Sequence, residues 1–255
     1  KKAIEMNVSA YLDRINYHGS TQPTVETLRA IHRAHLLTVP FENLDIHRNR
    51  QIVLNEAALF EKIVVNRRGG YCYELNGLLA SLLLQMGFDV TMFSANVIHG
   101  GIPAEIDHLT LLIQLDERWI VDVGFGDSSR LPLRLVEEEK LYGVDSTYRF
   151  VRSEDRWLLQ RLIETEEWYD EYSFDVNLIP LALSDFEEAN RYYQTEPESY
   201  FVQGRICSRA MEEGRISLTD NALNVTRNGQ REETPMEDEQ AFVRALNEHF
   251  GIRII

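Results

Sequence analysis

The spacing of apolar residues changes near residue 88, and this change limits the fold of the chain more than any other feature of its sequence. Before it, Leu75, Leu78 and Leu82 follow a helical repeat, and Gly87 stands where a helix commonly ends. From Phe88 onward, apolar and polar residues alternate, as they do in half-buried β-strands. The sequence therefore predicts an α+β protein in which helices come first and strands follow.

The chain divides into a helical start, a β-rich middle and a mixed α/β end. Helices are expected at 8–15, 24–35, 54–65 and 72–87, and strands at 90–97, 109–115, 119–125, 148–151, 157–159 and 167–169. Strands this short and this close together favour a small antiparallel barrel or sandwich. For the end of the chain we expect a helix at 186–193, strands at 201–210 and 214–225, a hairpin turn at Asn228-Gly229 and a helix at 236–250.

The charge and cysteine content restrict the class of partner. The formal net charge of −15 argues against a nucleic-acid-binding surface. No apolar run approaches the roughly 18 residues of a membrane helix, and the first residues lack the apolar region of a signal peptide. Because Cys72 and Cys207 are the only cysteines, there is no disulfide framework, which favours a reducing cytoplasm. We therefore expect a cytoplasmic protein that binds small molecules, with no nucleic acid and no membrane as partner.

Two histidines raise the question of a metal site. His32 and His35 lie three residues apart on the second predicted helix, a spacing at which two side chains can share a metal ion. No third ligand accompanies them and their neighbours are charged, so a solvent-exposed helix face is the preferred interpretation. We expect no metal.

Cys72 is the first candidate for chemistry. Gly69 and Gly70 can adopt the positive φ of a tight turn, so Cys72 is expected at the start of the helix that follows. Unpaired N–H groups and the positive dipole end of a helix favour a thiolate at such a position. A free cysteine also commonly serves as a small apolar filler, so position alone leaves catalysis and packing as equal alternatives.

A cysteine nucleophile needs a base that removes its proton and a group that orients the base. His108 opens one predicted strand, and Asp122 lies near the end of the next. A carboxylate within an apolar strand costs free energy unless it is paired, which makes Asp122 a better candidate than most other acids. The order cysteine, histidine and acid, with the cysteine at a helix start, indicates a papain-like arrangement.

The turn between these two strands decides whether His108 and Asp122 can meet. A two-residue turn at Asp116-Glu117 would place them on opposite faces of the sheet. We predict instead that a longer loop or a bulge brings them to one face, within hydrogen-bond reach of about 2.6–3.2 Å.

Taken together, these segments resemble the arylamine N-acetyltransferase family. The matching residues span roughly the first half of the chain: Pro40-Phe41-Glu42-Asn43-Leu44, Arg68-Gly69-Gly70-Tyr71-Cys72-Tyr73-Glu74-Leu75-Asn76, His108, Asp122-Val123-Gly124-Phe125-Gly126 and Pro132-Leu133-Arg134-Leu135. The last third is similar only through Glu196-Pro197 and Phe201. The resemblance implies three parts, an N-terminal helical bundle over 1–87, a central antiparallel β-barrel over 88–190 and a C-terminal α/β lid over 191–255.

The resemblance also implies an activity and roles for single residues. The activity is acetyl transfer from acetyl-CoA, through a thioester on Cys72, to an arylamine or hydrazine, with His108 as base and Asp122 as its orienting group. Phe41, Phe125 and Phe201 would line the amine pocket, although plain core packing is the alternative for all three. An ion pair between Glu42 and Arg68 would lie under the site. Apart from the resemblance, Gly124 and Gly126 match the first two glycines of a dinucleotide fingerprint but the third is missing, so we expect no Rossmann site and expect free backbone amides at Gly126 to face the phosphates of CoA.

Two other classes of function remain open at this stage. A cysteine hydrolase or a transglutaminase-like enzyme would use the same three residues with water or a lysine as acceptor. A binding protein that kept only the fold would have an unreactive Cys72.

Overall fold

The computed structural model of the 255-residue chain describes residues 6–99, 106–127, 129–144, 146–163 and 165–254. Its helices are α1 (Val8–Arg14), α2 (Val25–Thr38), α3 (Leu44–His47), α4 (Glu56–Phe60), the π-helix η1 (Glu61–Val65), α5 (Cys72–Gln85), the 3₁₀-helix η2 (Leu183–Phe186), α6 (Glu187–Thr195), α7 (Tyr200–Gln203) and α8 (Glu239–Phe250). Within these residues, no helix is long and apolar enough to cross a membrane.

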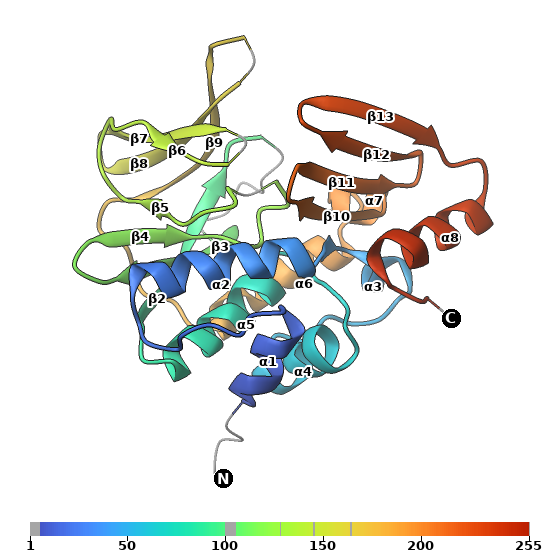
Figure 1. Cartoon of the computed structure of the whole chain (residues 1–255), viewed down its shortest axis with the longest axis horizontal. Helices are drawn as coiled ribbons and strands as arrows, with labels where there is room; N and C mark the ends of the chain where they lie inside the picture. Colours follow the sequence, from blue (N-terminus) through green and yellow to red (C-terminus); the bar gives the residue numbers. More distant parts are fainter. Residues whose placement is uncertain (1–5, 100–105, 128, 145, 164, 255) are drawn as a thin grey trace.

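The strands form two antiparallel sheets that lie side by side above the helices (Figure 1). One sheet has the order β5-β4-β3-β2-β9-β8-β7-β6 and is nearly barrel-shaped; the other has the order β1-β10-β11-β12-β13. The strand bounds are β1 (Phe41–Glu42), β2 (Asp89–Val97), β3 (His108–Gln114), β4 (Arg118–Val121), β5 (Leu133–Arg134), β6 (Leu141–Tyr142), β7 (Thr147–Ser153), β8 (Arg156–Leu162), β9 (Trp168–Asp175), β10 (Ile206–Met211), β11 (Gly214–Thr219), β12 (Ala222–Arg227) and β13 (Gln230–Pro235).

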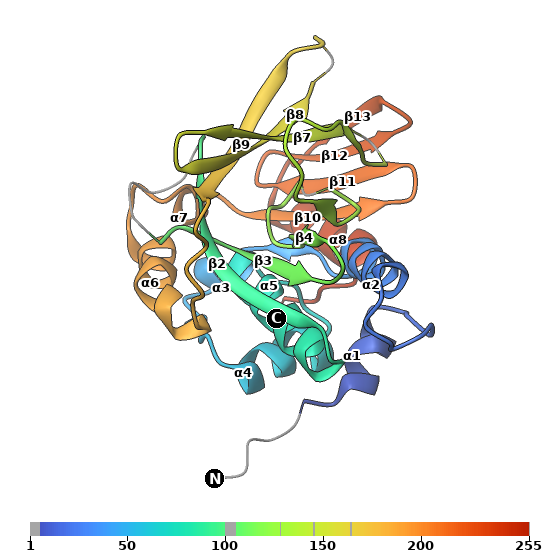
Figure 2. The same ribbon diagram turned by 90° about the vertical axis from the view of Figure 1, so that its left-hand side faces the viewer.

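The helix α5 is the central element of the largest core. Leu75, Leu78, Leu79 and Leu82 are all fully buried, and burial of each leucine stabilises the fold by about 1.5–3 kcal/mol. The helix packs against β2 and β3, which cross in front of it in Figure 2. The predicted start at Cys72 and the glycine after the helix are both confirmed, since Gly87 has a φ of +86°.

Two further cores complete the molecule. One fills the interior of the larger sheet around Phe93, Phe150 and Phe174. The other lies between the C-terminal sheet and α8, and it also takes in Leu44 from the helical part. The mixture of helices and antiparallel sheets agrees with the predicted α+β class, whereas the division of the chain at residues 87 and 190 stays a prediction.

The glycine pair before Cys72 has a different purpose from the one predicted. Arg67, with a φ of +52°, adopts the left-handed conformation, and the two glycines do not. Instead, the chain passes so close to Pro40 that a Cβ on Gly69 would lie 1.9 Å from the Pro40 carbonyl oxygen. Glycine is required here by close approach of two backbone segments.

The C-terminal strands differ from the sequence prediction in two places. The expected strand at 201–210 begins as the helix α7, and only Ile206–Met211 is extended. The expected strand at 214–225 is a hairpin of β11 and β12 that turns at Asp220-Asn221. Alternating apolar residues continue through both strands of the hairpin and hide the turn from a pattern-based prediction. The predicted turn at Asn228-Gly229 is confirmed, with φ values of +49° and +77°.

The prediction of a solvent-exposed face at His32 and His35 is wrong. Both rings are buried, with exposures of 1% and 0%. His35 lies 3.1 Å from the Tyr11 hydroxyl through its Nδ1. Burial lowers the pKa of His32 to about 4 and that of His35 to about 3, so both are neutral at pH 7. Among the described residues, no group of three or more His, Cys, Asp or Glu is placed to hold a metal ion.

Candidate active site

Three elements bring Cys72, His108 and Asp122 together. Cys72 is the first residue of α5, His108 is the first residue of β3, and Asp122 directly follows β4. Cys72 and His108 line the same cavity, and the pKa of each is affected by the other. His108 Nε2 lies 2.7 Å from Asp122 Oδ2. The three side chains thus lie together, and each is at least nine-tenths buried.

The loop between β3 and β4 explains how His108 and Asp122 share one face. Leu112 pairs with Ile120, so the loop has one residue more than a two-residue turn. In this register Asp122 lies opposite Thr110, which is two residues from His108. Residues two apart in a strand point to the same side of the sheet. The prediction that a longer loop brings the two side chains together is confirmed.

The electrostatics of the site depend on Asp122. Burial is the largest single influence and by itself would raise the pKa of Asp122 and lower that of His108. The charge attraction between them, together with the hydrogen bonds that each makes, outweighs burial in both cases. The pKa of His108 therefore lies well above its ordinary value. For Cys72 the balance differs from the sequence prediction, because burial raises the pKa of the thiol and outweighs the opposing effect of His108.

Asn76 and Gly124 are two residues whose importance sequence reasoning missed. Asn76 Nδ2 donates to Asp122 Oδ1 at 2.9 Å, and Asn76 Oδ1 accepts from the Val123 N–H at 2.9 Å. A Cβ on Gly124 would lie 2.6 Å from the Cα of Cys72. Asn76 lies four residues after Cys72, so it falls on the same face of α5. The four-residue spacing between Cys72 and Asn76 is the sequence signal that could have identified Asn76.

The three predicted phenylalanines meet at the cavity that contains Cys72. This cavity has a volume of about 270 Å³ and is lined by Cys72, His108, Phe41, Phe125 and Phe201 among others. The rings of Phe41 and Phe201 have centroids 6.0 Å apart, and Phe125 contacts His108 edge-on at 5.3 Å. The cavity is therefore apolar on several sides and polar at the nucleophile.

Gly126 lies in a second, adjoining cavity. This cavity has a volume of about 660 Å³ and shares Phe41, Phe125 and Phe201 with the first. Gly126 has a φ of +85°, a conformation that favours glycine. Arg205 and Arg215 also line this cavity and are its positively charged residues.

A buried ion-pair cluster supports the helix start from below. Arg68 Nη2 lies 2.8 Å from Glu42 Oε1, which confirms the ion pair that the family resemblance implies. Lys62 Nζ lies 2.7 Å from Glu74 Oε1, and the second oxygen of Glu74 accepts a hydrogen bond from the Tyr71 N–H at 3.2 Å. The cluster thus fixes the residue that precedes Cys72. Sequence reasoning found the Glu42 pair and missed the Lys62 pair.

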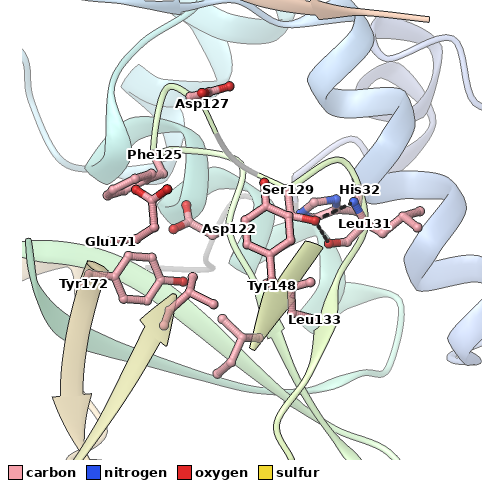
Figure 3. Close-up of a pocket in the computed structure, with 12 residues that line it drawn as sticks. His32, Asp122, Phe125, Asp127, Ser129, Leu131, Leu133, Tyr148, Glu171 and Tyr172 are labelled. Atoms are coloured by element: carbon pink, nitrogen blue, oxygen red, sulfur yellow. Dashed lines mark hydrogen bonds between the residues drawn. The ribbon is translucent and has the colours of Figure 1, made fainter. Parts of the chain in front are cut away.

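A smaller cavity of about 20 Å³ lies beside Asp122. Figure 3 shows Asp122, Phe125 and Glu171 grouped on one side of it, with His32 on another. Burial raises the pKa of Glu171, and Asp122 adds to this effect, whereas the guanidinium of Arg161 opposes it. The site therefore contains a second buried carboxylate that the sequence did not single out.

Comparison with known proteins agrees with this geometry. A family model described as N-acetyltransferase matches residues 24–255. The arylamine N-acetyltransferase of Escherichia coli (strain K12) is 34% identical over 250 residues, which cover 96% of this chain and 88% of that protein. The resemblance inferred from the motifs in the first half of the sequence thus extends over nearly the whole chain.

Solved structures give the same result for the fold. The arylamine N-acetyltransferase of Salmonella typhimurium has a TM-score of 0.89 and 34% identity, covering 96% of this chain and 90% of that one. The Mycobacterium marinum arylamine N-acetyltransferase in complex with CoA has a TM-score of 0.88 and 33% identity, covering 96% and 93%. The chain therefore belongs to the arylamine N-acetyltransferase family.

Proposed function

We propose that this enzyme transfers the acetyl group of acetyl-CoA to the nitrogen of an arylamine or arylhydrazine through a thioester on Cys72. The observation that carries the proposal is that Cys72 shares a cavity with His108, which lies 2.7 Å from Asp122. It has the parts of a papain-like triad: a thiol, a base and a carboxylate that orients the base. A CoA complex among the structural relatives supports acetyl-CoA as the donor.

In the first half-reaction, Cys72 attacks the thioester carbonyl of acetyl-CoA. His108 holds the proton of Cys72 as an imidazolium, which Asp122 stabilises. Attack forms a bond between the Cys72 sulfur and the carbonyl carbon and places a negative charge on the oxygen, which backbone N–H groups of the first turn of α5 stabilise. The carbon–sulfur bond to CoA then breaks, and CoA leaves with the proton from His108.

In the second half-reaction, the amine nitrogen attacks the acetyl group on Cys72. Arylamines and hydrazines are weakly basic and hence uncharged at pH 7, so their lone pair is available. His108 accepts the proton from the nitrogen as the bond from carbon to Cys72 breaks, and the thiolate is restored. The apolar walls formed by Phe41, Phe125 and Phe201 suit the aromatic ring of such an acceptor.

The adjoining 660 Å³ cavity is the proposed donor cleft. It opens beside the Cys72 cavity and contains Gly126, whose backbone is accessible because the residue has no side chain. Arg205 and Arg215 line it as well, but Asp220 and Asp127 also line it and pair with them at 2.5 and 2.8 Å. Because these charges offset one another in a protein whose net charge is −15, the backbone at Gly126 is the feature proposed to meet the phosphates of CoA. In this proposal the C-terminal sheet acts as the lid over the donor.

The test is steady-state kinetics together with the mass of the protein. With acetyl-CoA and an arylamine, double-reciprocal plots should show parallel lines, and omission of the amine should leave one acetyl group on the protein. Cys72→Ser should abolish both, because the serine hydroxyl stays protonated beside this imidazole. The matched variant Cys207→Ser changes the other cysteine, in β10, and should still become acetylated.

Intersecting lines, or an active Cys72→Ser variant, would show direct transfer in a ternary complex and refute the thioester. The comparisons do not favour a hydrolase or a non-catalytic binding protein. The same mass measurement separates these alternatives: a hydrolase would lose the acetyl group quickly without amine, and a binding protein would never acquire it.

A further inference from the structure

The cavity that contains Cys72 also holds charged side chains that the proposed acetyl transfer does not use. Asp107, Arg161 and Glu171 line it together with Cys72 and His108. A cavity that receives only an uncharged aromatic ring has no need of them, and each buried charge costs free energy when it is removed from water. Their arrangement therefore bears on which ring substituents the cavity accepts.

Asp107 is completely buried and directly precedes His108. Its Oδ1 accepts a hydrogen bond from the Tyr193 hydroxyl at 2.7 Å, and its Oδ2 accepts one from the Val97 N–H at 2.9 Å. Both donors are uncharged groups, so they hold the side chain of Asp107 in place without supplying a counter-charge. Its field reaches the nucleophile, because the charge of Asp107 adds to burial in raising the pKa of Cys72.

Arg161 is the cation in the same cavity, but two carboxylates already bind it. Its Nε lies 2.5 Å from Glu171 Oε1, and its Nη1 lies 2.6 Å from Asp127 Oδ2. Asp127 in turn lies 2.8 Å from Nε of Arg215. The two cations and two anions of this cluster balance, and Asp122 pairs with His108, which leaves Asp107 as a carboxylate of this cavity that forms no ion pair among the described residues.

We propose that Asp107 makes the acetylated enzyme select neutral or cationic aromatic acceptors and reject those with a carboxylate on the ring. This inference rests on the proposed function, since it concerns the acceptor of the acetyl group on Cys72. An anionic substituent entering the cavity loses its hydration and meets a like charge, and the arginine that lines the cavity, Arg161, is already paired with two carboxylates. The attacking nitrogen also becomes positive as the new bond forms, and the same carboxylate favours that change.

The expected size follows from the charges. Two like charges about 8 Å apart, at an effective dielectric constant of about 20, repel enough to change kcat/KM by about 30-fold. Removing the Asp107 charge should raise kcat/KM for an anionic acceptor by most of that factor. It should change kcat/KM for a neutral acceptor much less.

Three acceptors of nearly the same shape test this proposal: 4-aminobenzoate, 4-aminobenzamide and 4-aminobenzamidine, which carry a negative, a zero and a positive charge. The wild-type enzyme should prefer the amide and the amidine to the carboxylate. The carboxylate substituent withdraws less electron density from the ring than the amide does, so the amino group of 4-aminobenzoate is intrinsically the better nucleophile. Reactivity alone would therefore make the carboxylate, and not the amide, the preferred acceptor. In Asp107→Asn, the ratio of kcat/KM for amide over carboxylate should fall by about tenfold or more.

Controls separate the charge from its surroundings. Asp89→Asn makes the same change in net charge at an exposed position at the start of β2 and should leave the ratio unchanged. If Asp107→Asn folds poorly, Asp107→Ser removes the same charge and keeps an acceptor oxygen near the Val97 N–H. Because each ratio is taken within one variant, a general loss of activity cancels.

Two results would overturn the proposal: equal use of the amide and the carboxylate by the wild-type enzyme, or an unchanged ratio in both Asp107 variants. Either could occur while 4-aminobenzamide is still acetylated, and the proposed function would then stand. Failure of the proposed function looks different, since no acetyl group would appear on Cys72 with any acceptor, and this inference would fall with it.

Discussion

Replacing Asn76 by alanine removes the side chain that ties the helix of the nucleophile to the strands of the base and the acid. The amide of Asn76 makes three hydrogen bonds: Nδ2 donates to the Leu109 carbonyl at 2.7 Å and to Asp122 Oδ1 at 2.9 Å, and Oδ1 accepts from the Val123 N–H at 2.9 Å. Asn76 has an exposure of 0%, so water cannot replace these partners in the variant.

The size of the effect follows from this count. Each of the two neutral hydrogen bonds contributes about 1 kcal/mol, and the one to the carboxylate contributes about 1.5–3 kcal/mol, so the variant should lose about 4 kcal/mol of stability. For a chain of this length, that loss lowers Tm by roughly 8–16 °C. Asp122 keeps its bonds to His108 and to the Gly124 N–H. Activity should therefore fall by about 10- to 100-fold, through misplacement of the base, and should not vanish.

Urea unfolding and acetylation kinetics on the same preparations check both numbers. The control is Asn66→Ala, at an exposed asparagine whose side chain makes one long hydrogen bond of 3.4 Å to Glu61. This variant should change stability by no more than about 0.5 kcal/mol. A loss below about 1 kcal/mol for Asn76→Ala, together with a wild-type rate, would refute the argument that Asn76 holds the site together.

Three other measurements test the same electrostatic and steric reasoning. The folded-state pKa of His108 is raised and that of Asp122 is lowered. Their pairing therefore stabilises the protein fully between about pH 4 and pH 6.5, the ordinary pKa values of the two groups. This stability is lost as pH rises through the elevated pKa of His108 or falls through the depressed pKa of Asp122. Asp122→Asn should then cost more stability near pH 5 than near pH 9, and equal costs would contradict the pairing. Glu42→Gln should cost about 1.5–3 kcal/mol in urea unfolding, because it removes a buried charged hydrogen-bond partner of Arg68, which keeps Asp45 at 3.1 Å; a cost within the error of measurement would show that Asp45 suffices. Iodoacetamide should alkylate Cys72, which lines a cavity, much faster at neutral pH than the other cysteine, which is fully buried in β10; equal rates in peptide maps would favour packing as the role of Cys72.

Local patterns were sufficient for the elements that local interactions determine. The stripe of leucines and the following Gly87 located α5 to within two residues. Asn228 and Gly229 located the hairpin turn between β12 and β13, since few residue pairs adopt positive φ at two successive positions. Both features depend on residues close in sequence, and no distant contact competes with them.

Long-range contacts determine the features that the sequence left out. His35 is polar and lies among charged neighbours in sequence, yet it is buried because Tyr11 supplies a hydroxyl at 3.1 Å. The pKa of Cys72 was expected to fall at a helix start, and it rises because the neighbouring sheet excludes water from the sulfur. Asp107 gave no signal at all, since its donor Tyr193 comes from α6, far along the chain. Each case needs a partner that only the fold supplies.

The length of the loop from Leu115 to Glu117 determines whether His108 and Asp122 can meet in this fold. The loop is closed by a hydrogen bond of 2.9 Å from the Leu115 N–H to the Glu117 carbonyl, and the register it sets places His108 and Asp122 on the same face. Removal of one residue from the loop would shift the register by one and turn Asp122 to the other face of the sheet. Asp122 would then lose His108, and the buried carboxylate would have no cation to offset its cost of desolvation. At the same time Trp119 and Val121, which pack in one core, would change places with Ile120, which packs in the other, so the fit of these side chains to the two cores selects the register that the chemistry needs. Core packing and the geometry of the site are thus fixed by one register and cannot vary independently.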